Sequence, residues 1–540
     1  MCLSRSVFSG DQARESVASA GRGIPVIVRR MSLSSGRRAA RWADTLLGGV
    51  AARSCHSLAL SGSVHAAIVS DGGYMEPAHE VLSLSKVGHP VGQQENKPTM
   101  PDAREVRRIC GFLISRSDRL HLGQLPDARD RRGRRWSLPP LVLASLLGMM
   151  TGQNSFADVE RLTDKLPRAI RKCLGIPRRV ADTTLRDAHA TLDPSDLRPV
   201  LHSQVRSAHA SKSLRSDFNL PFGVVAMDGK YITVPAVDDK YSQRCHRDLD
   251  QGPLTGRIGT MTAVLTSSEA RPCIDVYPIA AATNEMGTFS RALDSLLRAY
   301  GQLDLFRLVS YDAGACSMAN AQVVRDRHLH YLFRLKGSQP ELSTAASLWL
   351  GSLPKQQADA VSVDGSGNRQ VTRRVFVRAC TATPEGWEHL KTVIRVDSES
   401  FDRLGRPVEE SFYFLSSLPI DRLSPEQWLT IIRRHWGVET AHQVLDVAFR
   451  EDDRPWVTEN PRLTVVLMIL RRIGYTLLTL FRSVTQRSDS RRTEPWKVLF
   501  ERIRDALLLA TDELIDGLRR RTDRDTSPPP LTAASMSTLG

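Results

Sequence analysis

The sequence predicts an α/β fold: one mixed β-sheet with flanking helices, preceded by an all-helical domain and interrupted by a β-rich insertion. Three observations lead to this prediction. The chain of 540 residues is too long for one hydrophobic core. Residues 101–220 show only helical periodicity. From about Phe222 onward, short apolar runs alternate with amphipathic segments, which is typical of a sheet covered by helices.

Residues 1–100 differ in composition from the rest of the chain. They are rich in Ser, Ala, Gly and Arg, with arginines clustered between Arg29 and Arg41. An organellar transit peptide has a similar composition. Alternatively, translation begins at Met75 or Met100, and the stretch is a non-native leader or a disordered tail. We expect a disordered or non-native N-terminal extension here.

Residues 101–220 are predicted to form a helical DNA-binding domain. An apolar helix is expected over residues 141–150. The segment from Asp182 to Arg186 is typical of a helix start, with Asp182 as the N-cap. In a helix-turn-helix this end of the recognition helix meets base edges, so Arg186 is a candidate DNA contact. A purely structural helical bundle explains these residues equally well.

Residues 221–341 are predicted to form the first part of the α/β core. The apolar run 223–227 ends in Asp228, as a buried central strand would. An amphipathic helix with Phe289 and Leu293 on its apolar face is expected further on. The other strands of this part are expected over residues 258–267, 272–278, 305–311 and 330–335.

The rest of the chain divides into three expected parts. Residues 342–420 contain short strands separated by polar turns, and we interpret them as a β-rich insertion. The core resumes over residues 421–484, where Ser424 is followed by proline and, three residues on, by glutamine, a strong helix-start signal. Residues 485–540 are expected to be a basic C-terminal tail, loose around one helix near residues 497–518.

Charge and composition narrow the class of function. The chain has 74 Lys and Arg against 59 Asp and Glu, a formal charge of +15, which favours a polyanionic partner. The most apolar stretches, 141–150 and 463–470, are too short to cross a bilayer, so no membrane association is expected. The sequence has no GxxxxGK[ST] loop for a nucleotide and no CxxC pair for zinc.

Three places in the sequence carry candidate acidic chemistry. Asp228 and Asp312 each follow an apolar strand and precede small residues, and ligands of open α/β sheets bind at strand ends. Paired carboxylates of this kind suit Mg²⁺, although each Asp alone could be a turn former. The third place is a helix on which His435, Glu439, His442 and Asp446 are spaced to share one face, either solvated or lining a site.

Longer phrases around these acids resemble a known family. They are similar, in chain order, to the landmarks of DDE transposases of the insertion-sequence group that includes the H-repeat-associated proteins. The resemblance covers roughly residues 105–480. The phrases are MDGK from Met227, SYDAGACS from Ser310, YLFRLKGSQPEL from Tyr331 and RRHWGVETAHQVLDVAFREDD from Arg433.

The sequence departs from this family's pattern at several positions. Ser338 and Thr440 stand where the family usually has Asn, and Gln443 stands where it has Trp. Ile432 and His435 fall at offsets where some relatives carry Tyr and Arg. The three acids are intact, so the departures concern contacts with the DNA ends.

The resemblance implies a fold, a site and a reaction. It implies an RNase H-like core in which Asp228, Asp312 and Glu439 are the catalytic residues and the ligands of Mg²⁺ or Mn²⁺. The reaction implied is in-line phosphodiester cleavage at transposon ends, followed by transfer of the freed 3′-OH into target DNA. Double-stranded DNA is the implied partner, with a homodimer assembled on it, in the bacterial cytoplasm at the nucleoid.

Candidate DNA contacts accompany these acids. They are Lys230, Lys336, Arg434 and His435, which lie within the phrases quoted above, and Arg186, which lies in the helical domain. Each could equally be an ordinary surface charge.

Three alternatives remain at this point. The first is a catalytically decayed, DNA-binding relative of a transposase, and the second is a nuclease without strand transfer. The third is a zinc hydrolase that uses His435, Glu439 and His442, whose spacing differs from the HExxH motif.

Overall fold

A computed structural model describes residues 100–526, with gaps at 177, 217–218, 246–254, 313, 315, 336–338, 366–369, 382 and 403. The expected N-terminal extension, apart from Met100, therefore lies outside the described residues. So does the end of the expected C-terminal tail, from residue 527 onward.

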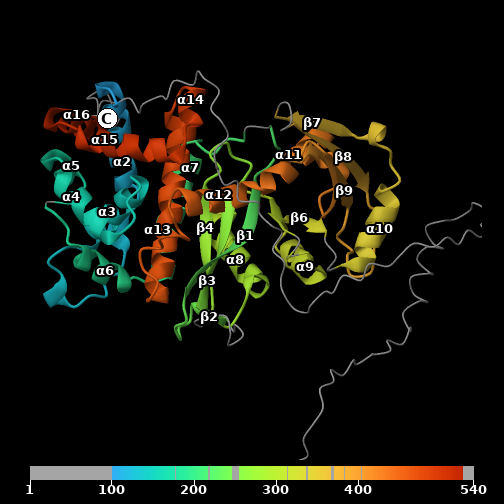
Figure 1. The fold of residues 1–540 in the computed structure, drawn as a ribbon, viewed down its shortest axis with the longest axis horizontal. Helices are drawn as coiled ribbons and strands as arrows, with labels where there is room; N and C mark the ends of the chain where they lie inside the picture. Colours follow the sequence, from blue (N-terminus) through green and yellow to red (C-terminus); the bar gives the residue numbers. More distant parts are fainter. Residues whose placement is uncertain are drawn as a thin grey trace, which may run out of the picture. The chain divides into compact units, whose positions relative to one another are not determined.

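A ten-stranded mixed sheet lies at the centre of the described chain (Figure 1). The strands are β1 (Val224–Pro235), β2 (Ser242–Cys245), β3 (Thr255–Leu265), β4 (Cys273–Ile279), β5 (Leu308–Tyr311), β6 (His330–Leu335), β7 (Ala360–Asp364), β8 (Val371–Ala379), β9 (Thr392–Phe401) and β10 (Pro407–Ser416). Their order is β2-β3-β1-β5-β6-β10-β9-β8-β7, and β4 also pairs with β3. The β1–β5 and β5–β6 pairs are parallel, and the other pairs are antiparallel. The predicted mixed α/β fold is confirmed.

Strand β1 is longer than the sequence suggested. The apolar run was expected to end at Asp228, but β1 continues to Pro235. It continues because β3 pairs with it along its whole second half, up to Pro235 opposite Thr255. The parallel partner β5 ends much earlier, at Tyr311 opposite Met227. Asp228 therefore marks the end of the β1–β5 ladder and lies inside β1.

The strands expected to form an insertion extend the same sheet. Strand β10 pairs with β6, and β9, β8 and β7 follow outward from it. Without this pairing, β6 would leave a row of unsatisfied backbone groups at the sheet edge. The β-rich segment is thus continuous with the core sheet, and helix α10 (Pro340–Leu350) precedes it.

Helices flank the sheet. Helix α8 (Glu285–Tyr300) packs against β3 and β4, and α9 (Met318–Asp326) packs against β6. Helix α11 (Pro425–His435) has the predicted capping box of Ser424 and Gln427. Helix α12 (Gly437–Val447) follows and packs against β1 and β3.

An N-terminal helical region precedes the sheet, as predicted. Its helices are α2 (Ala103–Asp118), α3 (Leu138–Met150), α4 (Phe156–Lys165), α5 (Arg168–Cys173), α6 (Asp182–Ala190) and α7 (Pro194–Ala210). One detail of the prediction was wrong: Asp182 is the first helical residue of α6, and Ala181 is the N-cap. The amide of Asp182 instead donates a hydrogen bond to Glu160 at 3.1 Å.

Helix α13 (Pro461–Leu480) runs through the protein core. The sequence suggested a short apolar segment over residues 463–470, but the helical stretch Pro461–Thr485 is long and apolar enough to cross a membrane by length and composition alone. Its apolar window is entirely buried inside the protein, as in the core helix of a folded domain. Helix α13 packs against α3, α7 and β4, so it joins the helical region to the sheet.

The C-terminal region contains more ordered helix than expected. Helices α14 (Asp489–Arg492), α15 (Trp496–Leu508) and α16 (Asp512–Thr526) replace the single helix predicted near residues 497–518. Apolar side chains, among them Leu499, Ile503 and Ile515, bury α15 against α2 and α16 against α2 and α5. Helices α15 and α16 of the expected loose tail are therefore packed against the helical region.

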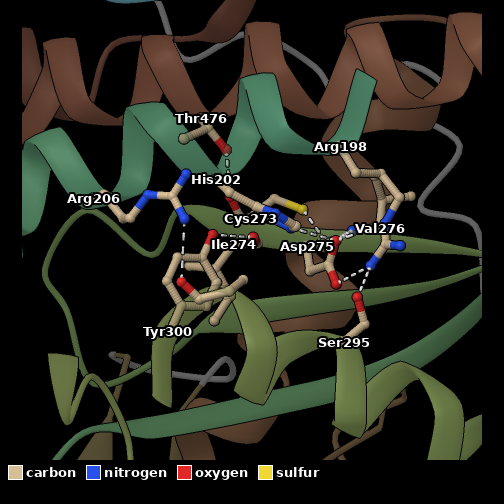
Figure 2. A network of polar contacts seen from close by, with 11 residues as sticks. Arg198, His202, Arg206, Cys273, Ile274, Asp275, Val276, Ser295, Tyr300 and Thr476 are labelled. Atoms are coloured by element: carbon tan, nitrogen blue, oxygen red, sulfur yellow. Dashed lines mark hydrogen bonds and ion pairs between the residues drawn. The ribbon is translucent and has the colours of Figure 1, made fainter. Parts of the chain in front are cut away.

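A buried ion-pair network also connects the helical region to the sheet (Figure 2). Figure 2 shows Arg198 and His202 of α7 pointing toward Asp275 of β4. Arg198 contacts both carboxylate oxygens of Asp275, at 3.0 and 2.5 Å, and His202 Nε2 lies 2.9 Å from Oδ1. Burial alone would raise the pKa of Asp275, but His202 and Arg198 hold that pKa below its usual value.

Candidate active site

Asp228 and Asp312 lie side by side at the end of the β1–β5 ladder. Met227 is paired with Tyr311 in parallel register. Asp228 is the residue after Met227, and Asp312 is the residue after Tyr311. Burial, together with the nearby charge of Asp312, raises the pKa of Asp228 to about 7. The sheet topology therefore brings together two acids that are distant in the sequence.

Helix α12 contacts Asp228 directly. His442 Nδ1 lies 3.1 Å from Asp228 Oδ2, and the imidazole is buried. Burial, assisted by Arg472 and Lys230, lowers the pKa of His442 to about 3, so the ring is neutral at physiological pH. When Asp228 is ionised, a neutral ring can make this contact only with its proton on Nδ1.

The helix expected around Glu439 is two helices. Helix α11 ends at His435, Trp436 forms the junction, and α12 begins at Gly437. His435 Nδ1 lies 2.9 Å from the hydroxyl of Ser310 on β5. His435 thus fixes the junction over β5, and His442 fixes α12 over β1. Exposed Glu439 lies between these two fixed points, on the helix next to the aspartates.

Lys230 has carboxylate partners inside the protein. Its Nζ lies 2.7 Å from Asp446 and 2.8 Å from Asp452. Burial by itself would lower the pKa of Lys230, but the bonds and charges of these two acids raise it. In this structure, Lys230 therefore holds α12 and the following loop against β1.

Two other expected DNA contacts are also engaged inside the protein. The Arg434 guanidinium is buried and donates to the carbonyl oxygen of Thr266 at 3.0 Å. His435 is buried against Ser310, and burial together with Arg334 lowers the pKa of His435 to about 4. Both side chains hold the α11–α12 junction in this structure.

The remaining expected DNA contacts lie elsewhere. Arg186 is exposed on α6. Lys336 lies outside the described residues.

Comparison with known protein families agrees with this geometry. A family described as "Transposase DDE domain" matches residues 221–471, which contain the sheet and all three acids. A second family, described as "DDE_Tnp_1-associated", matches residues 120–204 in the helical region. The chain belongs to the DDE transposase family.

Individual relatives of this transposase are distant. The "H repeat-associated putative transposase YhhI" of Escherichia coli (strain K12) is 24% identical over 352 residues, 62% of this chain and 83% of the relative. The "Putative protein YbfL" of the same strain is 22% identical with the same coverage. The "Putative transposase YncI" of Escherichia coli O157:H7 is 23% identical and covered to 80%.

DDE transposase domains generally use a divalent metal, and the donor atoms of this transposase are of the matching kind. Asp228 and Asp312 are hard oxygen donors that repel each other when both are ionised, and a dication between them would remove that repulsion. His442 engages one oxygen of Asp228 and leaves the other for a ligand. Within the described part of the chain, no three His, Cys, Asp or Glu side chains gather closely enough to hold a metal ion.

The zinc-hydrolase alternative gains no support from the side-chain positions. His435 and His442 would both have to face Glu439 in such a site. Instead, the His435 ring contacts Ser310 on β5, and the His442 ring contacts Asp228 on β1.

Sequence reasoning missed a further acid, Glu285, at the first position of α8. Its Oε1 accepts a hydrogen bond from the Gly229 amide at 3.2 Å and another from the Tyr311 hydroxyl. Burial raises the pKa of Glu285 to about 7. The hydrogen bond from Tyr311 lowers this pKa, whereas the charges of Asp228 and Asp312 raise it further. An acid in the first turn of a helix usually only stabilises the helix by interacting with the helix dipole, so no sequence signal distinguished Glu285.

Proposed function

We propose that this chain is an active DNA transposase that cleaves phosphodiester bonds at transposon ends and joins the freed 3′-OH to target DNA. The observation that supports the proposal most is that Asp228 and Asp312 each follow the last pair of the parallel β1–β5 ladder, Met227 and Tyr311, beside the helix that carries Glu439. Family membership supports the same reaction class.

In this proposal Asp228, Asp312 and Glu439 hold two divalent cations, Mg²⁺ or Mn²⁺. When bound, the cations would activate the attacking oxygen and stabilise the leaving oxygen. His442 orients Asp228 through the 3.1 Å contact, and Lys230 fixes α12 against β1. Glu439 is exposed on α12, the helix that contacts Asp228 through His442, and in the proposal the binding of metal and DNA brings its carboxylate to the two aspartates.

Double-stranded DNA is the proposed substrate for both steps. Arg186 on α6 is the proposed contact with the transposon end, because it is exposed on a helix of the N-terminal region. Because two ends must be brought together for transposition, we further propose that two copies assemble on DNA at the bacterial nucleoid.

A cleavage assay tests the catalytic proposal. The full chain would be incubated with Mg²⁺ and a labelled DNA that carries the sequence flanking the gene, together with a supercoiled target plasmid. Asp228→Asn, Asp312→Asn and Glu439→Gln are each expected to lower cleavage at least about 1,000-fold, because each removes a charged ligand. DNA binding, measured by gel shift, should stay near wild type.

Glu410→Gln is the matched control, since Glu410 is exposed on β10 and far along the sheet from Asp228. Cleavage that persists in Glu439→Gln would contradict the proposed role of that residue. Cleavage without joining to the plasmid would identify a nuclease that lacks strand transfer. Binding without any cleavage by the wild type would identify a catalytically decayed protein.

A further inference from the structure

We infer that Glu285 is a positioning residue that holds Asp228 and Asp312 in register from the opposite face of the sheet. The inference rests on the proposed metal site at these aspartates. Glu285 contacts the residue that follows Asp228 and the residue that precedes Asp312. One carboxylate therefore ties together the two strand segments that carry the acids.

The first tie is to a backbone amide that the sheet leaves unpaired. Gly223 faces β5, since its carbonyl accepts from the Arg307 amide at 3.0 Å. Backbone groups of a strand alternate sides, so Gly229, six residues later, also faces β5. However, the β1–β5 ladder ends at Met227 and Tyr311. Glu285 Oε1 accepts from this amide, which has no partner on β5.

The second tie is to the last residue of β5. Tyr311 is buried, and its ring lies 5.1 Å from that of Phe289 on α8, the helix that carries Glu285. Its hydroxyl donates to the same Oε1 that accepts from Gly229. A single oxygen atom thus replaces the missing rung between β1 and β5, directly beside the aspartates.

Side-chain alternation places Glu285 behind the aspartates. Successive side chains of a strand point to opposite faces. Asp228 points toward His442 on α12, whereas a Cβ added at Gly229 would overlap the Glu285 carboxylate on the other face. Glycine after Asp228 is therefore required by the tie itself. This geometry makes Glu285 a support for the backbone, in contrast to Asp228, which faces α12.

Metal titration of the full chain separates positioning from direct binding. Calorimetry with Mn²⁺ would compare the wild type with Glu285→Ala, Glu285→Gln and Tyr311→Phe. Removing the tie in Glu285→Ala is expected to weaken Mn²⁺ binding about 10- to 100-fold, as for residues that orient metal ligands. Tyr311→Phe keeps the ring and loses one hydrogen bond, so about a fivefold loss is expected.

Glu285→Gln is the discriminating variant, because its amide oxygen can still accept from Gly229 and Tyr311. The Mn²⁺ affinity of this variant should be within about threefold of the wild-type affinity. If Glu285 bound the metal directly, replacing its carboxylate with a neutral amide would remove most of that affinity. In the cleavage assay, Glu285→Ala should lower kcat and leave the KM for DNA unchanged, because Glu285 lies behind the site.

The control is Glu426→Ala, which removes an exposed acid from the first turn of α11 and touches neither β1 nor β5. It should bind Mn²⁺ as the wild type does. If Glu285→Ala does not fold, Glu285→Gln and Tyr311→Phe still decide the question. Unchanged affinity in Tyr311→Phe, or a loss in Glu285→Gln as large as in Asp228→Asn, would overturn the inference.

The failure of the inference differs from the failure of the proposed function. If Asp228→Asn abolishes Mn²⁺ binding while Glu285→Ala does not affect it, the metal site stands and the positioning role is wrong. If Asp228→Asn binds Mn²⁺ as the wild type does, the proposed metal site is wrong, and the role of Glu285 is wrong with it.

Discussion

His442 Nδ1 lies 3.1 Å from Asp228 Oδ2, and this contact joins helix α12 to strand β1. The two residues are far apart in the chain, yet this contact, together with the ion pair of Lys230 and Asp446, holds the helix with Glu439 against the strand with the first acid. The contact therefore determines how the helix lies over the aspartate pair.

Removing this donor should weaken the proposed metal site. His442→Leu fills the buried space without a hydrogen bond, so the orientation of Asp228 is no longer fixed. We expect Mn²⁺ affinity to fall roughly 10-fold in calorimetry, with a smaller loss in His442→Asn, whose amide can replace the Nδ1 donor. Equal affinity in the wild type and His442→Leu would show that the contact is unimportant for the site.

Lys230 should behave as a structural residue and Arg186 as a DNA contact. Lys230→Met removes the ion pairs of a largely buried lysine to partly buried Asp446 and exposed Asp452, and should lower the free energy of unfolding by about 1–3 kcal/mol. Arg186→Gln changes an exposed side chain and should alter stability by less than about 0.5 kcal/mol.

DNA binding measured at several salt concentrations distinguishes the two residues. The logarithm of the DNA-binding constant falls linearly with the logarithm of the salt concentration, and losing one phosphate contact lowers the magnitude of this slope by about one. We expect this decrease for Arg186→Gln and no decrease for Lys230→Met. The reverse result would mean that Lys230 leaves its carboxylate partners to meet DNA.

The buried network at Asp275 should contribute strongly to stability. Asp275→Asn leaves the Arg198 guanidinium buried without its ion-pair partner, and breaking a buried pair costs about 3–5 kcal/mol. Because the pKa of Asp275 is lowered in the folded state, its contribution is present above the unfolded pKa of about 3.9 and is lost as pH falls below it. Urea unfolding at pH 7 measures the difference. Equal stability of the two proteins at that pH would contradict the prediction.

A buried histidine should make stability depend on pH in mildly acid solution. Burial lowers the pKa of His189 to about 4, whereas an unfolded histidine titrates near 6.5. Below about pH 6.5 the unfolded state binds a proton that the folded state does not, so stability falls as pH drops toward 4. The loss from His189 is at most about 3 kcal/mol.

His189→Gln provides the comparison for this pH effect. Its unfolding free energy, measured between pH 7 and pH 5, should fall less steeply than that of the wild type. Parallel curves would show that His189 does not titrate in this range. His435, which is also buried, retains its own contribution in both proteins.

Much of the fold was readable from the sequence. The helix start at Ser424 depends on neighbouring residues alone, and the structure has the predicted capping box. Strand β6 was predicted with its observed bounds. The end of β1 was not predictable, because β3, a separate segment, keeps β1 paired beyond Asp228. The break between α11 and α12 also escaped prediction, since Trp436 is a residue that helices accept.

The sequence by itself determined which residues are the candidates for the chemistry: three acids in recognisable phrases, two of them following apolar runs. Only the tertiary structure decided which charged side chains already have partners inside the protein and which remain available to contact DNA. Lys230 and Arg434 look like phosphate contacts in the sequence, yet they bond to Asp446 and to the Thr266 carbonyl inside the protein. Glu285 gave no local signal, yet it bonds beside both aspartates. Residue type and spacing are local properties, whereas the partner of a charged group depends on which distant strands the sheet brings together.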